Sequence, residues 1–366
     1  MTSHYVTRLA DGRELIYFDH KPGFDRSAAD QRTDLDPAPP ASQVRWDPLF
    51  GEYAVVAGHR NTRSYRPADS QCPLCPSRDG QRTEIPADDY EVAVFENRFP
   101  AFSLAAAETT AAEMPDPAAD QHFASAPGAG RCEVVCFTSD HGASFAQLPP
   151  SQARTVIDAW ADRTRALSAL EPVRYVFCFE NRGEEIGVTQ THPHGQIYSY
   201  PFVPPRFARA GAAAQRHQDA TGRCLQCDQL AAELAAGTRI VDQTAHWVAY
   251  VPFAARWPYE LRIVPRQHVA DLPALDEEQR DGLAIVYLSA LQRFDRLFDA
   301  PAPYIAAWLQ APVGQFRSGW HLAGEVFTIR RAPDRLKYLA GAESSAATWI
   351  NDIPAETAAA RLRDVM

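Results

Sequence analysis

The chain contains the segment Thr191-His192-Pro193-His194-Gly195-Gln196-Ile197-Tyr198, and the rest of the sequence is best interpreted outward from it. An apolar run at 175–180 and a turn-rich connection at 181–187 precede this segment. If residues 192–198 are extended, His192, His194 and Gln196 lie on one face, because side chains alternate along a strand. An imidazole on such a face can ligate a metal, transfer a proton or attack an electrophile. The alternative is an ordinary pair of surface histidines beside a proline.

The bulk composition excludes several classes of function. The 366 residues include 36 Lys and Arg against 46 Asp and Glu, a net charge of −10, and no basic block. We therefore expect no nucleic-acid partner. No stretch approaches the roughly 18 apolar residues of a membrane span, and no export signal is evident, so we expect a cytoplasmic protein without a membrane partner.

The order of motifs predicts an internal duplication. Each half contains a Cys-x-x-Cys motif, strands, a histidine, a helix, another strand and a second histidine-bearing strand. Tyr175 precedes His192 by 17 residues, and Tyr304 precedes His321 by 17. The superposition of the halves places Gly324 on Gly195, Ala323 on His194 and Glu325 on Gln196. We predict a catalytic half with an N-terminal arm at 1–205 and a degenerate half at 206–366.

Local patterns predict the elements of both halves. We expect a hairpin at 44–56, a surface loop at 105–130, and a helix from an N-cap at Ser151 to about Leu170. A second helix is expected from about Asp276 to Phe298, and residues 206–222 are interpreted as either a solvated helix or a linker. The remaining expected strands are 90–95, 132–137, 175–180, 246–251, 260–264, 304–308 and 320–327.

The cysteines and histidines of the repeat predict two metal sites. In a chain without an export signal, two Cys-x-x-Cys pairs indicate metal ligation rather than disulfides. Two thiolates and two imidazoles form a closed tetrahedral set that suits structural Zn²⁺. The alternative is that these cysteines are ordinary loop residues, whereas Cys132, Cys136 and Cys178 belong to the core. The two predicted zinc sites are Cys72, Cys75, His141 and His192, and Cys224, Cys227, His268 and His321.

The segment His192-Pro-His194-Gly-Gln196 resembles the active-site signature of the galactose-1-phosphate uridylyltransferase family, a transferase branch of the histidine-triad superfamily. The resemblance covers about residues 40–350. It implies an α+β fold of two fused histidine-triad-like halves, each an antiparallel sheet with flanking helices. Further matches are Arg45-Trp-Asp-Pro-Leu-Phe-Gly51, Gly58-His59-Arg60-Asn-Thr-Arg63, Cys72-Pro-Leu-Cys75, Asp140-His141, Phe179-Glu-Asn-Arg-Gly183 and Glu260-Leu-Arg-Ile-Val-Pro265.

The resemblance implies a two-step transfer of UMP. His194 would attack the α-phosphorus of UDP-glucose and release glucose 1-phosphate, and galactose 1-phosphate would then take the uridylyl group and leave as UDP-galactose. Gln196 replaces the third histidine of the hydrolytic branch, and an amide cannot act as a general acid near neutral pH. The implied partners are thus UDP-glucose, UDP-galactose and hexose 1-phosphates.

The family also implies substrate contacts and an assembly. Family members contribute an arginine-bearing arm across a dimer interface, so a homodimer is expected here. Some members hold a structural iron, but the matching positions here are Ala210, Leu309, Ala323 and Glu325, so we expect no iron. The positions that match substrate-binding residues of the family are Arg60, Arg63, Asn97, Asn181, Thr189 and Lys337.

Two alternative functions remain open from the sequence. A related phosphorylase or nucleotidyltransferase acting on ADP-glucose or a dinucleoside polyphosphate would keep His194 and Gln196 and differ in its base pocket. A non-catalytic, zinc-stabilised nucleotide-binding protein would not need the intact His-Pro-His-Gly-Gln motif.

Overall fold

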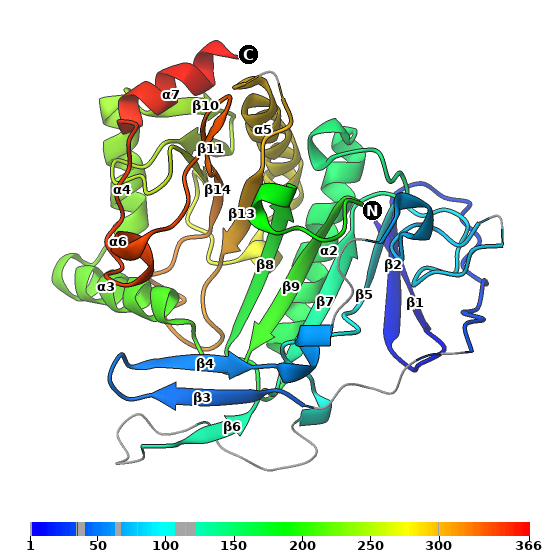
Figure 1. Cartoon of the computed structure of the whole chain (residues 1–366). Helices are drawn as coiled ribbons and strands as arrows, with labels where there is room; N and C mark the ends of the chain where they lie inside the picture. Colours follow the sequence, from blue (N-terminus) through cyan, green and yellow to red (C-terminus); the bar gives the residue numbers. More distant parts are fainter. Residues whose placement is uncertain are drawn as a thin grey trace.

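The computed structural model describes residues 2–33, 35, 41–62, 67–78, 80–106, 114, 122–298 and 300–366. An eleven-stranded sheet runs through the whole molecule in the order β1-β2-β5-β7-β9-β8-β13-β14-β12-β11-β10 (Figure 1), and every neighbouring pair is antiparallel. Its strands are β1 (Ser3–Arg8), β2 (Glu14–Asp19), β5 (Val92–Glu96), β7 (Arg131–Cys136), β8 (Tyr175–Arg182), β9 (His194–Tyr200), β10 (Ile240–Gln243), β11 (Trp247–Tyr250), β12 (Tyr259–Pro265), β13 (Tyr304–Leu309) and β14 (Ala323–Thr328).

The predicted duplication is visible in the strand order. The first half contributes β5-β7-β9-β8 and the second contributes β11-β12-β14-β13 in mirrored order, so that the two halves meet where β8 pairs with β13. Each half inserts one long helix between its second and third strands, α2 (Pro150–Ser168) and α5 (Glu277–Arg296). The antiparallel α+β architecture predicted from the sequence is confirmed.

The equal spacing of Tyr175 and Tyr304 from the repeated histidines does not mark equivalent positions. Tyr175 packs with Phe207 on one side of the sheet, whereas Tyr304 belongs to the core under the long helices on the other side. A one-residue difference in position along a strand reverses the face, because side chains alternate. The prediction that Tyr175 and Tyr304 occupy equivalent positions is therefore wrong, although the strand order supports the repeat.

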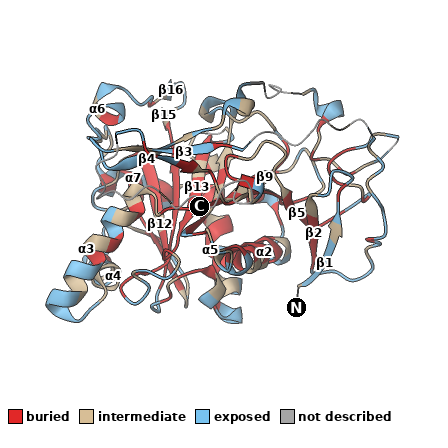
Figure 2. Ribbon diagram, turned by 90° about the horizontal axis from the view of Figure 1, so that it is seen from below, coloured by how far each residue is buried: buried red, intermediate tan, exposed pale blue. Residues whose placement is uncertain are grey.

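Helices α2 and α5 lie side by side on one face of the sheet and cover the main core. Figure 2 shows the central strands as buried, with these two helices next to each other. Their apolar sides carry Trp160 and Tyr287, which are packed edge to face. The expected second helix is present as α5, and its N-cap is Asp276, whose carboxylate accepts from the backbone nitrogen of Gln279. The predicted cap of α2 is wrong: Ser151 lies inside the helix, which begins at Pro150, because proline is well tolerated in the first helical turn.

The opposite face of the sheet carries smaller elements. A three-stranded sheet is formed by β4 (Glu52–Val56), β3 (Gln43–Asp47) and β6 (Ser125–Pro127), and it packs over the β9 side of the first half. Strand β6 lies inside the stretch expected to be only a loop, which is a correction. Residues 206–222 are helical, within α3 (Pro205–Thr221), and α3 packs against α4 (Leu225–Ala236).

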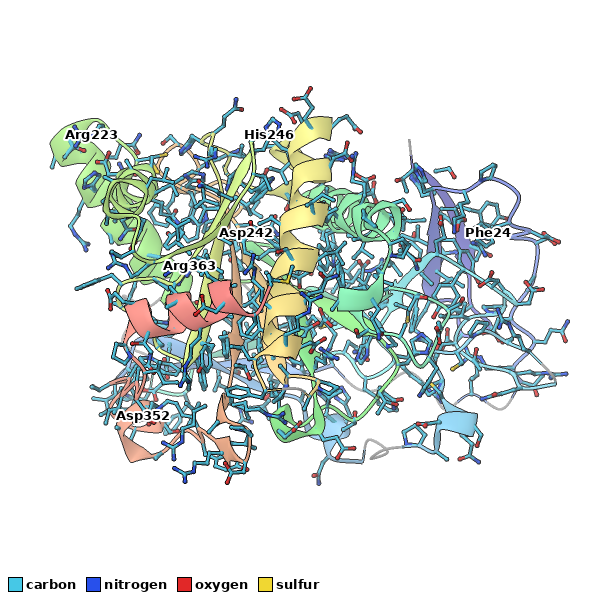
Figure 3. The ribbon with its side chains drawn as sticks, turned by 90° about the horizontal axis from the view of Figure 1, so that it is seen from above. Phe24, Arg223, Asp242, His246, Asp352 and Arg363 are labelled. Atoms are coloured by element: carbon cyan, nitrogen blue, oxygen red, sulfur yellow. The ribbon has the colours of Figure 1, made fainter. Side chains whose placement is uncertain are left out.

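The remaining elements lie at the edges of the fold. Helix α7 (Ala355–Asp364) covers the β10 edge, where the guanidinium of Arg363 donates to the carbonyl oxygen of Ile240 over 2.7 Å; Figure 3 shows Arg363 on α7 beside the strand of Asp242. Among the described residues, no helix combines the length and apolarity that crossing a bilayer needs. The short elements are β15 (Arg330–Ala332), β16 (Arg335–Leu336), α6 (Gly341–Ser344) and the 3₁₀ turns η1 (Gly58–Thr62), η2 (Asp69–Gln71), η3 (Phe145–Gln147), η4 (Glu184–Ile186) and η5 (Leu272–Ala274).

Candidate active site and metal centres

Strand β9 displays His194 and Gln196 on the face opposite the long helices. The intervening Gly195 and Ile197 are buried, and Ile197 belongs to the core under α2. The predicted alternation therefore holds for His194 and Gln196. His192 differs, because the strand begins only at His194 and the ring of His192 is buried within a cluster of possible metal ligands.

Glycine is required at position 195 for steric reasons. A Cβ atom there would lie 2.8 Å from Cζ of Phe137 and 2.9 Å from the backbone oxygen of Phe179, closer than real Cβ contacts. The neighbouring strand and the core ring can approach β9 closely only because this side chain is absent. The close approach places His194 directly against the strand β8 that carries Asn181.

A cavity of about 500 Å³ joins most of the predicted substrate-binding residues. Its wall combines backbone and side chains of β8, β9 and the loops after β4 and β5. Arg60 donates from Nη1 to the hydroxyl of Tyr198, 3.3 Å away, so a guanidinium lies on the same wall as the strand of His194. Arg63 lies outside the described residues. The predicted residues that line this cavity are Arg60, Asn97, Asn181, Thr189, His194 and Gln196.

Lys337 is not brought to this cavity. It is buried in the closing segment after β16, where its Nζ atom lies 2.8 Å from Oε1 of Glu343 and also bonds the carbonyl of Ile350. The hydrogen bonds of Lys337 and backbone amides together lower the pKa of Glu343 to about 2. The ammonium thus has a structural partner within its own chain, and Lys337 does not line the cavity that contains His194.

The orientation of His194 is set by its neighbour. Nδ1 of His194 lies 2.8 Å from the backbone oxygen of His192, a distance at which the ring donates its Nδ1–H. A neutral imidazole with hydrogen on Nδ1 carries its lone pair on Nε2. The ring is therefore held as the tautomer whose Nε2 can act as a nucleophile or base.

The first predicted ligand set is assembled by residues far apart in the sequence. The ligand atoms of Cys72, Cys75, His141 and His192 all lie within 4.8 Å of one another. Both imidazoles direct Nδ1 at the sulfur of Cys75, over 3.4 Å from His141 and 3.5 Å from His192. Burial lowers the pKa of His192 to about 4, which keeps this ring neutral.

The second half repeats the arrangement. Cys224, Cys227, His268 and His321 form a cluster of the same size. The sulfur of Cys227 lies 3.4 Å from Nδ1 of His268 and 3.3 Å from Nδ1 of His321. Helix α4 begins directly after Cys224, so Cys227 lies in its first turn.

The donor sets fit a metal ion. In each cluster the buried histidine turns Nδ1 inward and holds its Nε2 near a backbone oxygen, Thr138 at 2.8 Å from His192 and Pro265 at 2.9 Å from His321. Nε2–H donation to a carbonyl leaves the lone pair on the inward nitrogen, as metal-bound imidazoles require. The structure therefore contains two groups that could hold a metal ion, made of the residues predicted from the sequence.

The second half lacks the reactive side chains at the equivalent strand positions. Ala323 stands where His194 stands, and Glu325 replaces Gln196. Glu325 accepts two hydrogen bonds from Arg206, at 2.8 and 2.6 Å, and one from Arg262 at 3.0 Å. Burial opposes ionisation of Glu325, but these arginines lower its pKa to about 2. An ion-pair cluster thus fills the surface that corresponds to the active face.

Two features near His194 escaped the sequence reasoning. A smaller cavity of about 130 Å³ adjoins His194 and is lined by Glu180, which is buried where the halves meet. Burial raises the pKa of Glu180 to about 7, against a hydrogen bond from the Tyr304 hydroxyl at 2.7 Å. Tyr90, treated only as the start of a strand, contacts His192. Nothing in the local sequence distinguishes either residue from ordinary strand residues.

Comparisons with known proteins agree with this geometry. The model of the N-terminal domain of galactose-1-phosphate uridyl transferase matches residues 32–204, and that of the C-terminal domain matches residues 211–366. A galactose-1-phosphate uridylyltransferase from Streptomyces lividans is 45% identical over 369 residues, covering 98% of this chain and 97% of the relative. That from Thermotoga maritima is 34% identical, covering 88% and 98%.

Solved structures show the same fold. A uridylyltransferase superposes with a TM-score of 0.77 at 32% identity, covering 88% of this chain and 98% of that one. An ADP-glucose phosphorylase from Arabidopsis thaliana reaches 0.68 at 22% identity, covering 88% and 99%, and this similarity concerns the fold alone.

The fold, the site and the two matching domain models define a nucleotidyltransferase built from two related halves that share one antiparallel sheet. The chain belongs to the galactose-1-phosphate uridylyltransferase family.

Proposed function

We propose that this protein transfers UMP from UDP-glucose to galactose 1-phosphate, as in galactose metabolism, through a covalent uridylyl group on His194. The observation that carries the proposal is the His194 ring on the wall of a 500 Å³ cavity with its Nδ1 held by the His192 carbonyl. Relatives that match nearly the whole chain bear the name of this activity.

In the first step, Nε2 of His194 attacks the α-phosphorus of UDP-glucose. The new N–P bond replaces the bond between that phosphorus and the oxygen of glucose 1-phosphate, which leaves with the electron pair. In the second step a phosphate oxygen of galactose 1-phosphate attacks the same phosphorus and regenerates His194. A covalent intermediate divides one difficult displacement into two easier ones.

The polar wall of the cavity supports this chemistry. Gln196 follows His194 on the same face, so its amide can donate to a phosphoryl oxygen during transfer. Arg60 supplies positive charge for the diphosphate, and an arginine is well suited to phosphate oxygens. Asn97, Asn181 and Thr189 provide further neutral polar groups on the same wall. We propose these residues as substrate contacts, and we propose the same role for Arg63, which lies outside the described residues.

We propose zinc as the metal of both Cys₂His₂ groups. Two sulfurs and two nitrogens satisfy four-coordinate Zn²⁺ and leave no position for a reacting water, so the ion would have a structural role. In the first half, the ring of His192 would bind the metal, and the backbone carbonyl oxygen of His192 would accept the hydrogen bond from the ring of His194. The metal group would thus stabilise the start of strand β9.

We further propose a homodimer of cytoplasmic chains, each divided into a catalytic half at 1–205 and a degenerate half at 206–366. The division agrees with the continuous sheet, since the halves meet through paired strands β8 and β13. Sedimentation velocity over a concentration series measures the assembly, and a monomer at all concentrations would contradict the dimer.

Covalent labelling tests the transfer. UDP-glucose with ³²P in the α-phosphate should leave an acid-labile, base-stable label on His194, with one glucose 1-phosphate released per label. The matched control is His217, a histidine on α3 bound to Asp228. His194→Ala should abolish labelling and His217→Ala should preserve it. Label on another residue, or turnover by His194→Ala, would contradict the mechanism.

The same assay separates the alternatives. ADP-glucose in place of UDP-glucose gives label faster if the protein is an adenylyl-specific phosphorylase. Binding of UDP-glucose without label or release of glucose 1-phosphate indicates a nucleotide-binding protein. Parallel-line kinetics with galactose 1-phosphate are expected for the proposed reaction, because the two sugar phosphates occupy the site in turn.

A further inference from the structure

The hydroxyl of Tyr90 lies at the point where the first metal group, strand β7 and the reactive segment meet. Tyr90 is 2% exposed, and its hydroxyl donates to the backbone oxygen of Leu74 over 2.8 Å. The same oxygen lies 2.9 Å from Nε2 of His192. Cys136 of β7 lies close enough to this hydroxyl for each group to affect the pKa of the other. A phenol has one hydrogen to donate, which goes to Leu74, and its lone pairs face the Nε2–H of His192, which is shared with the Thr138 carbonyl.

Each partner belongs to a different part of the site. Leu74 lies inside the Cys72–Cys75 loop, and His192 is a member of the same group of possible metal ligands. Cys136 pairs with His194 across the β7–β9 ladder. Tyr90 therefore contacts both the Cys72–Cys75 loop and the ring of His192, and it lies beside the strand that pairs with His194.

The contact continues to the reactive ring. Nε2 of His192 lies 2.8 Å from the Thr138 carbonyl oxygen and 2.9 Å from the Tyr90 hydroxyl, so its one hydrogen points between these two acceptors and restrains the ring. The carbonyl of the same residue accepts the Nδ1–H of His194. A shift of His192 would move the acceptor that orients His194, and displacements near 1 Å cost on the order of 100-fold in rate.

We propose that Tyr90 is a positioning residue of the first half, which holds the Cys72–Cys75 loop against His192 and thereby keeps His194 in its reactive orientation. This inference rests on the proposed metal and on the proposed nucleophile. Tyr90 touches neither substrate nor metal in this role, and it acts through His192.

In the second half, a different side chain joins the Cys-x-x-Cys loop to the buried histidine. There the side-chain oxygen of Gln226, inside the Cys224–Cys227 loop, accepts from the backbone nitrogen of His321 over 2.9 Å. The ring of His321 is held by the carbonyl of Pro265. A hydrogen-bonded contact between the Cys-x-x-Cys loop and the buried histidine therefore exists in both halves, and a single substitution can remove the contact in one half without changing the other.

The chain offers matched variants for a test. Tyr90→Phe removes only the hydroxyl. Tyr17→Phe is the control, because Tyr17 belongs to the same apolar cluster, is 1% exposed, and its hydroxyl accepts a hydrogen bond from Ala87, which is not one of the predicted ligands. Gln226→Leu is the reciprocal variant for the second half.

The measurement is site-resolved metal loss. Zinc-loaded protein is mixed with a chromophoric chelator and N-ethylmaleimide, and peptide mass spectrometry follows alkylation of Cys72 and Cys75 against Cys224 and Cys227. Tyr90→Phe should release metal and expose the first pair about 10-fold to 100-fold faster than wild type, the range typical of groups that hold metal ligands. Gln226→Leu should accelerate only the second pair, and Tyr17→Phe neither.

Steady-state kinetics supply the second readout. With both metals bound, Tyr90→Phe should lower kcat about tenfold with KM for UDP-glucose nearly unchanged, because only the orientation of His194 is affected. Equal alkylation rates for Tyr90→Phe and Tyr17→Phe would overturn the inference. So would simultaneous alkylation of the core thiols Cys132 and Cys178, which would reveal general unfolding. Wild-type protein that holds no metal would overturn both this inference and the zinc proposal, while the His194 labelling would still be judged independently.

Discussion

The Nδ1 atom of His194 and the backbone oxygen of His192 are 2.8 Å apart, so one residue orients the next but one along the chain. Because the ring of His192 also lies in a metal-binding group, the metal centre and the proposed nucleophile are joined through one residue. A metal ligand two positions away can thus influence catalysis without contacting substrate.

Gln196 should control the balance between transfer and hydrolysis. We expect Gln196→His to slow formation of UDP-galactose and to increase release of free UMP, because an imidazolium can protonate a leaving group and an amide cannot. The ratio of UMP to UDP-galactose, measured by chromatography, tests this. Gln196→Met, which removes the amide without adding an acid, should slow transfer and leave the ratio unchanged. A higher ratio in both variants would contradict the argument.

Metal content should be two zinc ions per chain. Elemental analysis of protein purified without added metal should give zinc near two equivalents and no iron. Cys72→Ser should lose one equivalent and the His194 label, whereas Cys227→Ser should lose one equivalent and keep labelling, because the second group lies in the half without the reactive histidine. Structural zinc contributes on the order of 10 kcal/mol to folding in small domains, so both variants should also unfold more readily. One equivalent in wild type would refute the second site.

Alanine substitutions at the equivalent glycines Gly195 and Gly324 should distinguish an effect on stability from an effect on activity. An added methyl group would meet Phe137 and Phe179 at position 195, and Cζ3 of Trp308 at 2.8 Å at position 324. We expect each Gly→Ala variant to lose about 1–3 kcal/mol of unfolding free energy, the usual cost of overpacking. Only Gly195→Ala should also lower kcat, on the order of 10-fold to 100-fold, since His194 flanks it. Equal activity losses in both variants would mean that the effect is general.

Glu180 should make stability depend on pH. Its folded pKa is raised from 4.5 to about 7 by burial, with Tyr304, Tyr287 and Arg182 opposing the shift and Asp295 adding to it. The unfolded chain releases the proton first as pH rises, so the contribution is fully favourable below pH 4.5 and is lost as pH rises to 7. The loss amounts to about 3 kcal/mol over this range.

Glu180→Gln tests this linkage. Urea unfolding at pH 5, 6, 7 and 8 should show the variant gaining stability relative to wild type as pH rises to about 7, and then a constant difference. Glu171→Gln, at an exposed position, should show no such trend. A difference between Glu180→Gln and wild type that is independent of pH would contradict the raised pKa.

Local chemistry carried much of the prediction. The alternation of His194 and Gln196, the second long helix and the two Cys₂His₂ groups follow from residue type and spacing, because each depends on short-range geometry or on a repeated motif. The family resemblance added the α+β fold. Two predictions failed by a single residue position. Ser151 was predicted to be the N-cap of α2 but lies inside the helix. Tyr175 and Tyr304 were matched by equal spacing but lie on opposite faces of the sheet, because a shift of one residue reverses the face of a strand.

The sequence by itself determined which groups can do chemistry: an imidazole and an amide on one strand face, and eight potential ligands in two sets. Only the tertiary structure decided which of them act together. It placed Arg60, Asn97 and Asn181 in the wall of the cavity that contains His194, and it paired Lys337 with Glu343 outside that cavity. It also brought Tyr90 into contact with His192 and placed Glu180 beside His194, which their own sequence neighbours do not indicate. The physical reason is that strands distant in sequence pack against one another and thereby determine which polar groups are buried and which come within hydrogen-bonding distance. The pKa and the hydrogen-bond energy of each polar group then depend on those neighbours.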